Sequence, residues 1–388
     1  MSKSKKAVII TASILSVVLI FAAVFFVLYY FTDGPKQVEK GAVTNTEVYT
    51  EPETEEPTDI VDSMTLEEKV AQMIMVSCHP GVDIEDASSF GVGGLCLYGF
   101  SFDNKTFDEI VSMTSLYQSL SKTPMLISVD EEGGDVVRVS DNTNLRDTPF
   151  LSPSELYNEG GMELVKSDTE EKADLLLSLG INVNLAPVCD LPLDSSNYIY
   201  DRCISLDHNI TSVYASTVVS AMKGKKIGSC LKHFPGYGGS VDTHQSMSYD
   251  SRGYSDFENG DFKPFESGID AGADCVLVSH NIVSCMDDTM PASLSKPIHD
   301  ILRDKLGFDG VIMTDDLVMQ GIAQFTNGEN AAVMAVIAGN DMIICEDYEG
   351  AVKAIVKAVN NGEISENQIT ESVRRIMKWK SDLGIIKY

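Results

Sequence analysis

The sequence predicts an α/β fold, a TIM-type (β/α)8 barrel that is preceded by one transmembrane helix and a disordered stalk. Short apolar runs recur after about residue 60, amphipathic stretches lie between most of them, and polar residues follow the runs. Buried strands that alternate with helices indicate a parallel sheet, and about eight such units indicate a barrel. A doubly wound open sheet is the alternative, which the absence of a G-x-G-x-x-G turn after the first strand disfavours.

The N-terminal segment is expected to be a signal anchor. Residues 1–6 carry three lysines, and residues 7–31 carry no charge and can cross ~30 Å of hydrocarbon as a helix. The apolar run ends in aromatic residues suited to the membrane interface, and a cleavable signal peptide has a shorter apolar core. We therefore expect a cytoplasmic tail (1–6), a transmembrane anchor (7–31) and an extracellular domain on the cell membrane, with cleaved secretion as the alternative.

Residues 32–59 are rich in Thr, Glu and Pro and contain almost no large apolar side chain. Such a segment buries too little to offset its ordering entropy, so it is expected to be a disordered acidic linker. The chain as a whole carries a net charge of −29, which argues against nucleic acid as a partner. The remaining residues, 60–388, are expected to form the barrel.

The expected strands are apolar runs, and the expected helices carry apolar residues at helical spacing. A first helix opens at Thr65, with Glu68 in capping-box spacing. The strands are expected at residues 73–77, 94–97, 125–129, 182–188, 227–231, 275–279, 310–314 and 342–345. The helices are expected at residues 105–120, 169–179, 210–223, 262–271, 296–306 and 329–338, with a last helical region at 348–383. The eight cysteines show no metal-ligand spacing and are expected to be mostly free and buried.

Polar side chains follow five of these strands. They are Asp130 with Arg138 after the third, Asp190 after the fourth, Lys232 and His233 after the fifth, His280 and Asn281 after the sixth, and Asp315 and Asp316 after the seventh. Each could be a helix cap, but the C-terminal ends of barrel strands share one face, where active sites lie. The segment from Lys232 to His244 is the densest, with two histidines, a lysine and Asp242 around a glycine-rich turn; a solvated surface loop is the alternative.

These groups supply the parts of retaining glycoside hydrolysis. Asp315 offers a carboxylate nucleophile, and His244 offers a proton carrier that titrates near neutral pH. Asp242 could orient His244 and favour its charged form. No G-x-S-x-G elbow and no metal triad occur, so the sequence predicts neither a metal site nor a cofactor.

Three motifs resemble family 3 glycoside hydrolases over roughly residues 60 to 388, in the branch of the β-N-acetylhexosaminidases. They are Lys232-His233-Phe234-Pro235-Gly236 with Asp242-x-His244, Val129-Asp130-x-Glu132-Gly133-Gly134, and Thr314-Asp315-Asp316-Leu317-x-Met319. The resemblance implies that Asp315 is the nucleophile and that Asp242 and His244 form the acid/base dyad. It also implies that sugar is held by Asp130, Arg138, Arg202, Lys232 and His233.

The resemblance implies a retaining exo-β-N-acetylglucosaminidase that acts on terminal β-linked N-acetylhexosamine of peptidoglycan-derived glycans. Asp135 and Tyr237 depart from the family pattern, which leaves substrate preference open. The alternatives are a β-glucosidase or glycoside phosphorylase of the same family, and a non-catalytic barrel that binds cell wall. Asp316 is expected to act as a cap or support, and His79 is expected to have no role in the site.

Overall fold

The computed structural model describes residues 60–388, apart from residues 240–247, 320–321, 323–324 and 327–329. The expected tail (1–6), anchor (7–31) and linker (32–59) therefore lie outside the described residues, and so do Asp242 and His244. Among the helices that are described, none combines the length and the apolar character that crossing a membrane requires.

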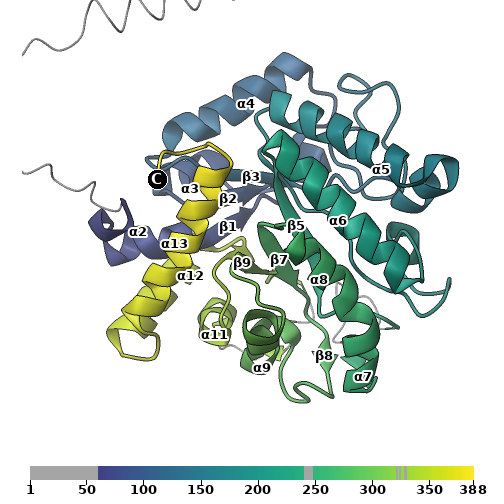
Figure 1. Ribbon diagram of the computed structural model, residues 1–388. Helices are drawn as coiled ribbons and strands as arrows, with labels where there is room; N and C mark the ends of the chain where they lie inside the picture. The colour runs from purple at the N-terminus through teal and green to yellow at the C-terminus, as the bar shows by residue number, and fades with distance from the viewer. Residues whose placement is uncertain (1–59, 240–247, 320–321, 323–324, 327–329) are drawn as a thin grey trace, which may run out of the picture. The chain divides into compact units, whose positions relative to one another are not determined.

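Eight parallel strands form a nearly closed barrel of the TIM type, in the order β10-β1-β2-β3-β4-β5-β7-β9 (Figure 1). The strands are β1 (Ile74–Ser77), β2 (Gly94–Cys96), β3 (Leu126–Val129), β4 (Val183–Asn184), β5 (Gly228–Phe234), β7 (Cys275–Val278), β9 (Val311–Thr314) and β10 (Ile343–Cys345). The two end strands meet through a parallel bridge between Met313 and Met342. Each strand that the sequence predicted is confirmed, so the predicted barrel is correct.

The helices lie around the strands in Figure 1. They are α2 (Leu66–Gln72), α3 (Ile84–Phe90), α4 (Phe107–Leu120), α5 (Pro153–Ser178), α6 (His208–Lys225), α7 (Tyr254–Asp256), α8 (Phe262–Asp270), α9 (Lys296–Asp300), α11 (Ala331–Ala338), α12 (Tyr348–Asn360) and α13 (Glu366–Asp382). Short 3-10 or π-helical turns cover Ile60–Ser63, Gly99–Ser101, Tyr200–Arg202, Phe257–Asp261, Ala292–Leu294 and Ile301–Lys305. A separate two-stranded sheet pairs β6 (Tyr249–Asp250) with β8 (Ile282–Val283).

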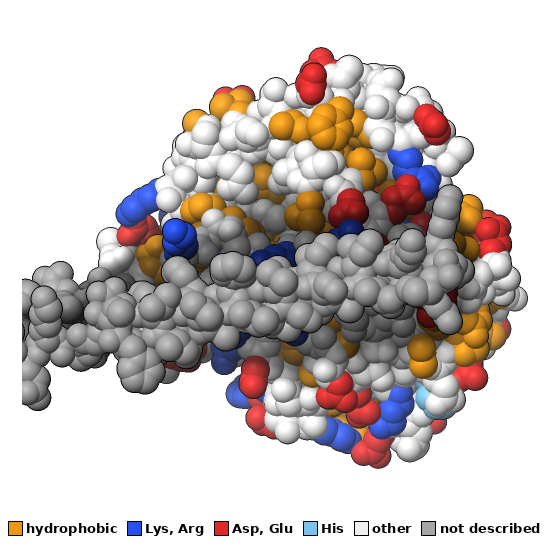
Figure 2. Space-filling model, turned by 45° about the horizontal axis from the view of Figure 1, so that its top comes forward, with side chains coloured by type: hydrophobic (Ala, Val, Ile, Leu, Met, Phe, Trp, Pro, Cys, Tyr) orange, Lys and Arg blue, Asp and Glu red, His pale blue; other side chains and the backbone are white. Residues whose placement is uncertain are grey.

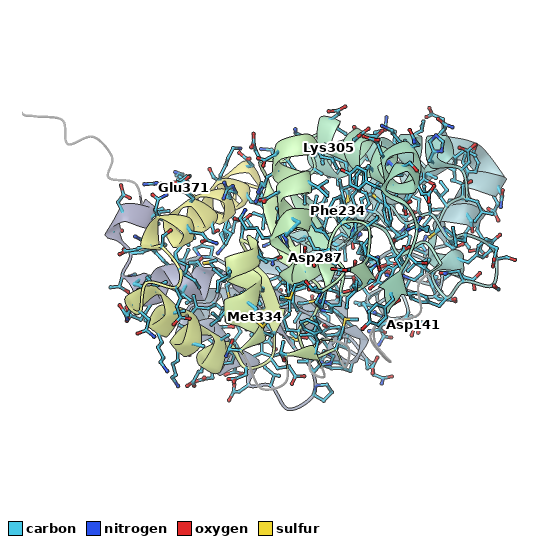
Figure 3. All side chains as sticks on the ribbon, turned by 90° about the horizontal axis from the view of Figure 1, so that it is seen from below. Asp141, Phe234, Asp287, Lys305, Met334 and Glu371 are labelled. Atoms are coloured by element: carbon cyan, nitrogen blue, oxygen red, sulfur yellow. The ribbon has the colours of Figure 1, made fainter. Side chains whose placement is uncertain are left out.

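The core explains why apolar runs predicted the strands. The residues of β1, β3, β7 and β9 are buried along their whole length, as expected for strands covered on both faces. Phe234 lies in the interior, whereas Lys305 and Glu371 lie at the periphery (Figure 3).

All eight cysteines are free, and only Cys285 is exposed. On the face shown in Figure 2, acidic and basic side chains are interspersed among hydrophobic ones.

Two helix expectations needed correction. The helix expected at 169–179 begins already at Pro153, because Ser152 and Glu155 form a capping box there. Gly161, at φ 65°, interrupts that helix and breaks the apolar periodicity. The helical region expected at 348–383 is two helices, α12 and α13. The capping box expected at Thr65 is confirmed, with both of its hydrogen bonds present.

Strand β5 is longer than expected, and this extension positions the site. The strand continues to Phe234, so Lys232 and His233 lie within it rather than after it. The chain then turns at Gly236, where φ is +121° and an added Cβ would lie 2.3 Å from Oδ1 of Asp261. Glycine is therefore required where the chain leaves the barrel wall.

Candidate active site

A cavity of about 390 Å³ lies at the C-terminal ends of the barrel strands. Six of the predicted site residues line it: Asp130, Arg138, Arg202, Lys232, His233 and Asp315. The structure therefore brings together all predicted site residues that it describes. The remaining two, Asp242 and His244, belong to the segment outside the described residues.

Lys232 stands between two carboxylates at the base of this cavity. Its Nζ lies 2.5 Å from Oδ1 of Asp130 and 2.6 Å from Oε1 of Glu132. The side chain is 2% exposed. Burial alone would lower the pKa of Lys232, but the charges of Asp130 and Glu132 raise it above its usual value. Lys232 is therefore a permanently charged donor.

Glu132 joins Lys232 to Arg202. The Arg202 Nε donates to Oε2 of Glu132 at 2.9 Å, and Nη2 donates to Oε1 at 2.8 Å. Burial raises the pKa of the Glu132 carboxyl, yet the cations Arg202 and Lys232 outweigh burial and hold that pKa well below its usual value. This bidentate ion pair fixes the plane of the guanidinium at the cavity wall.

Glu132 lies in one of the sequence motifs, but the sequence predicts no role for it. Its spacing from Asp130 was an available signal, because residues i and i+2 of an extended segment face the same side. The spacing does not identify the partners of Glu132. These are Arg202 and Lys232, which lie about 70 and 100 residues further along the chain. 

His233 is held by a second buried carboxylate. Its Nδ1 lies 2.7 Å from Oδ2 of Asp190, and its Nε2 lies 3.3 Å from Nη2 of Arg202. Because a guanidinium only donates, Nε2 accepts that contact and Nδ1 carries the proton toward Asp190. Asp190 also accepts the main-chain N–H groups of His233 and Tyr237, at 3.0 and 2.8 Å. Asp190 therefore orients the imidazole and anchors the turn that follows β5.

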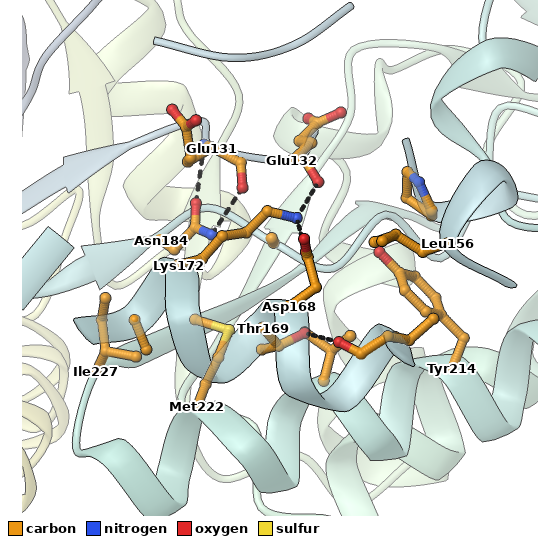
Figure 4. Close-up of a pocket in the computed structure, with 15 residues that line it drawn as sticks. Glu131, Glu132, Leu156, Asp168, Thr169, Lys172, Asn184, Tyr214, Met222 and Ile227 are labelled. Carbon is orange, nitrogen blue, oxygen red and sulfur yellow. Dashed lines mark hydrogen bonds and ion pairs between the residues drawn. The ribbon is translucent and has the colours of Figure 1, made fainter. Parts of the chain in front are cut away.

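The main chain of residues 131–132 is held from behind the barrel wall, beside a small internal cavity (Figure 4). Lys172 donates to the Glu132 carbonyl at 3.0 Å and pairs with Asp168 at 2.6 Å. Asn184 exchanges two hydrogen bonds of 2.9 Å with the main chain of Glu131. These contacts fix the segment from which Glu132 reaches the cavity.

The Glu131 carboxylate orients the loop that carries Arg138. It accepts the main-chain N–H groups of Arg138 and Val139, each at 2.7 Å. The Arg138 guanidinium then approaches Asp130, with Nη2 3.9 Å from Oδ2. Arg138 and Asp130 thus present a donor group and an acceptor group side by side on the cavity wall.

Asp315 lies on another part of the cavity wall, directly after β9. Its main-chain N–H donates to the Val278 carbonyl at 3.0 Å, and its Oδ1 accepts the Asp316 N–H at 2.8 Å. Asp316 caps the turn, as expected, by accepting the Val318 N–H at 3.1 Å. The expectation for His79 was wrong, because His79 lines the cavity and lies 3.3 Å from Asp316.

The side chains that line the cavity suit a substrate that carries hydroxyl groups. Within the part of the chain that the structure describes, no group of three or more His, Cys, Asp or Glu side chains is arranged to hold a metal ion. Lys232 and Arg138 supply fixed donors, Asp130 supplies an acceptor, and Asp315 supplies a half-buried carboxylate. Such alternating donors and acceptors recognise hydroxyl groups.

The family model for the glycosyl hydrolase family 3 N-terminal domain matches residues 65–379. This chain belongs to glycosyl hydrolase family 3. It is therefore a glycoside hydrolase, as the sequence resemblance implied.

Similar proteins match most of the chain. A Beta-hexosaminidase of Nitrosomonas eutropha is 32% identical over 265 residues, which are 67% of this chain and 75% of the relative. A Beta-hexosaminidase of Haemophilus influenzae is 31% identical over 281 residues, which are 71% of this chain and 78% of the relative. A family 3 β-N-acetylglucosaminidase structure from Paenibacillus sp. matches with a TM-score of 0.77 and 28% identity, over 83% of this chain and 63% of that chain.

Proposed function

We propose that this family 3 enzyme is a retaining exo-β-N-acetylhexosaminidase that releases terminal β-linked N-acetylglucosamine. The observation that carries the proposal is the position of Asp315 in one cavity with Asp130, Arg138 and Lys232. The relatives named Beta-hexosaminidase support the same activity. In this proposal Asp315 is the nucleophile, and His244 is the acid and base that Asp242 orients and charges.

The proposed reaction has two steps. Ionised Asp315 attacks the anomeric carbon and forms a covalent glycosyl ester, while His244 gives its proton to the leaving oxygen. Water then attacks the same carbon, His244 takes a proton from that water, and the Asp315 carboxylate is released. Two inversions give net retention. Lys232, Arg138 and Arg202 donate to hydroxyl or acetamido oxygens, His233 contacts the sugar, and Asp130 accepts from hydroxyl groups.

The test of the activity is a comparison of substrates with the purified full chain. We expect 4-nitrophenyl β-N-acetylglucosaminide to be cleaved with a kcat/KM at least about 100-fold above that of 4-nitrophenyl β-glucoside, a difference of about 2.7 kcal/mol. NMR of the first product should show the β-anomer. Faster cleavage of the glucoside would indicate a β-glucosidase. A sugar phosphate formed in phosphate buffer would indicate a phosphorylase, and sugar binding without turnover would indicate a non-catalytic barrel.

We also propose that residues 7–31 anchor the enzyme in the cell membrane, with the barrel outside the cell and peptidoglycan-derived glycans as its substrates. The uncharged length of this run and the lysines before it support the proposal. Full-length protein should sediment with membranes, dissolve only in detergent, and be digested by protease added to spheroplasts. A version without residues 1–31 should stay in the supernatant. Full-length protein in the supernatant would contradict the anchor.

A further inference from the structure

The carboxylate of Asp316 is a point where several strand ends of the barrel meet. Its Oδ2 accepts the hydroxyl of Ser77, the last residue of β1, and the hydroxyl of Tyr98 at 3.2 Å, after β2. Nε2 of His79 lies 3.3 Å from the same oxygen. Its Oδ1 accepts the main-chain N–H of Val318 at 3.1 Å. The residue is 8% exposed, so these contacts replace most of its hydration.

The main chain of Asp316 also makes hydrogen bonds, through both its carbonyl oxygen and its N–H. Its carbonyl oxygen lies 3.0 Å from Nε2 of His280, which donates because a carbonyl only accepts. His280 is fully buried, and its Nδ1 lies 2.7 Å from the hydroxyl of Ser293. The Asp316 N–H points the other way and donates to Oδ1 of Asp315 at 2.8 Å. Contacts from the ends of β1, β2 and β7 therefore hold the side chain and the carbonyl of Asp316, the residue whose N–H donates to Asp315.

We propose that Asp316 is a positioning residue, which fixes the Asp315 carboxylate for attack through its own main-chain N–H. This inference rests on the proposed function, in which Asp315 is the nucleophile. A fixed N–H on Oδ1 restrains the orientation of the carboxylate, and so restrains how its two oxygens face the sugar.

The convergence of donors gives Asp316 a task beyond capping. The cap needs only the Val318 N–H, and that bond uses Oδ1 alone. Oδ2 is contacted by Ser77, Tyr98 and His79. Hydrogen bonds to a charged carboxylate are stronger than hydrogen bonds between neutral groups. They prevent rotation of the side chain, and through it they restrain the peptide before Asp316. Precise positioning of a reacting group is where a small displacement costs most rate.

The test is Asp316→Asn in the full chain, assayed with an aryl β-N-acetylglucosaminide. The amide keeps the shape of the side chain but replaces one accepting oxygen with a donor, so Oδ2 or Oδ1 loses its partners. We expect kcat to fall about 100-fold. We expect KM and the inhibition constant of the product N-acetylglucosamine to stay within twofold, because Asp130, Arg138 and Lys232 still bind sugar.

A second variant covers the case in which Asp316→Asn does not fold. Tyr98→Phe removes one donor to Oδ2 and keeps the ring, which stacks on His79 with centroids 4.4 Å apart. We expect a kcat about 10-fold below that of the wild type, again without loss of product affinity. The matched control is Tyr117→Phe on α4, outside the cavity, which should leave kcat unchanged.

Two outcomes would contradict the positioning role and leave the proposed function unaffected. They are wild-type kcat in the folded variants, and a loss of product affinity that parallels the loss of kcat. Absence of hydrolysis by the wild type overturns the proposed function together with this inference. The failure of the inference and the failure of the function are therefore distinguishable.

Discussion

Asp315→Ala should lower kcat for an aryl β-N-acetylglucosaminide on the order of 10⁴-fold or more, because it removes the carboxylate that would form the covalent intermediate. The fold should survive the change. Asp315 is half-buried and follows β9, and the strand itself is held by parallel pairing with β7 through its main chain. Steady-state rates and circular dichroism of the variant and the wild type, prepared side by side, measure both expectations.

Added azide distinguishes a missing nucleophile from a damaged site. The space left by the carboxylate admits a small anion, which can attack the anomeric carbon from the same side as Asp315. We expect azide to restore part of the rate of Asp315→Ala with an activated leaving group, and to yield a glycosyl azide of inverted configuration. The control is Asp270→Ala, an exposed aspartate at the end of α8. A rate for Asp315→Ala within tenfold of the wild type would exclude Asp315 as the nucleophile.

The barrel was predictable because its signals are local. A strand that is buried on both faces needs a continuous apolar run, and the runs at Ile74–Ser77 and Cys275–Val278 have that form. The first half of α5 was missed because Gly160 and Gly161 interrupt its apolar spacing. Tertiary packing and the cap at Ser152 select the helix there instead.

The site was predictable in part. Asp130, Lys232 and Asp315 could be placed on one rim because parallel strands align their C-terminal ends. The fold brings these residues to one cavity, as expected. Long-range contacts determine the rest. Nothing near Glu132 in the chain shows that it pairs with Arg202, and nothing near Asp190 shows that it holds His233.

His79 illustrates the same limit. It lies in no motif, and a histidine after a strand is usually an ordinary polar residue of a turn. Its place in the cavity depends on stacking against Tyr98 and on its contact with Asp316, which lies 237 residues further along the chain. A residue that acts through partners in other parts of the chain leaves no pattern in its own sequence neighbourhood.

Glu132→Gln should lower the free energy of unfolding by about 3–5 kcal/mol and weaken sugar binding, because it removes the anion between the buried Lys232 and the partly buried Arg202. Glu132 is 3% exposed, so water cannot replace the lost charge. The amide nitrogen would also face a donor of Arg202 or Lys232, since both oxygens of Glu132 now accept. Chemical denaturation measures the stability, and the inhibition constant of N-acetylglucosamine measures binding. Glu159→Gln on the exposed face of α5 is the matched control and should change neither.

The stability that Glu132→Gln loses should depend on pH, because the pKa of the Glu132 carboxyl is lowered in the folded protein. Although burial raises the pKa of Glu132, Arg202 and Lys232 hold it below its ordinary value of 4.5. A carboxyl with a lowered folded-state pKa contributes stability above its unfolded pKa and loses that contribution as pH falls through the folded one. The difference in unfolding free energy between the wild type and Glu132→Gln should therefore be largest at pH 7 and should become smaller below about pH 4.5. A gap that stayed constant down to pH 2 would mean that the mispaired amide nitrogen, and not the lost charge, destabilises the variant. In that case the charge of Glu132 would not be what holds Arg202 and Lys232 at the cavity wall.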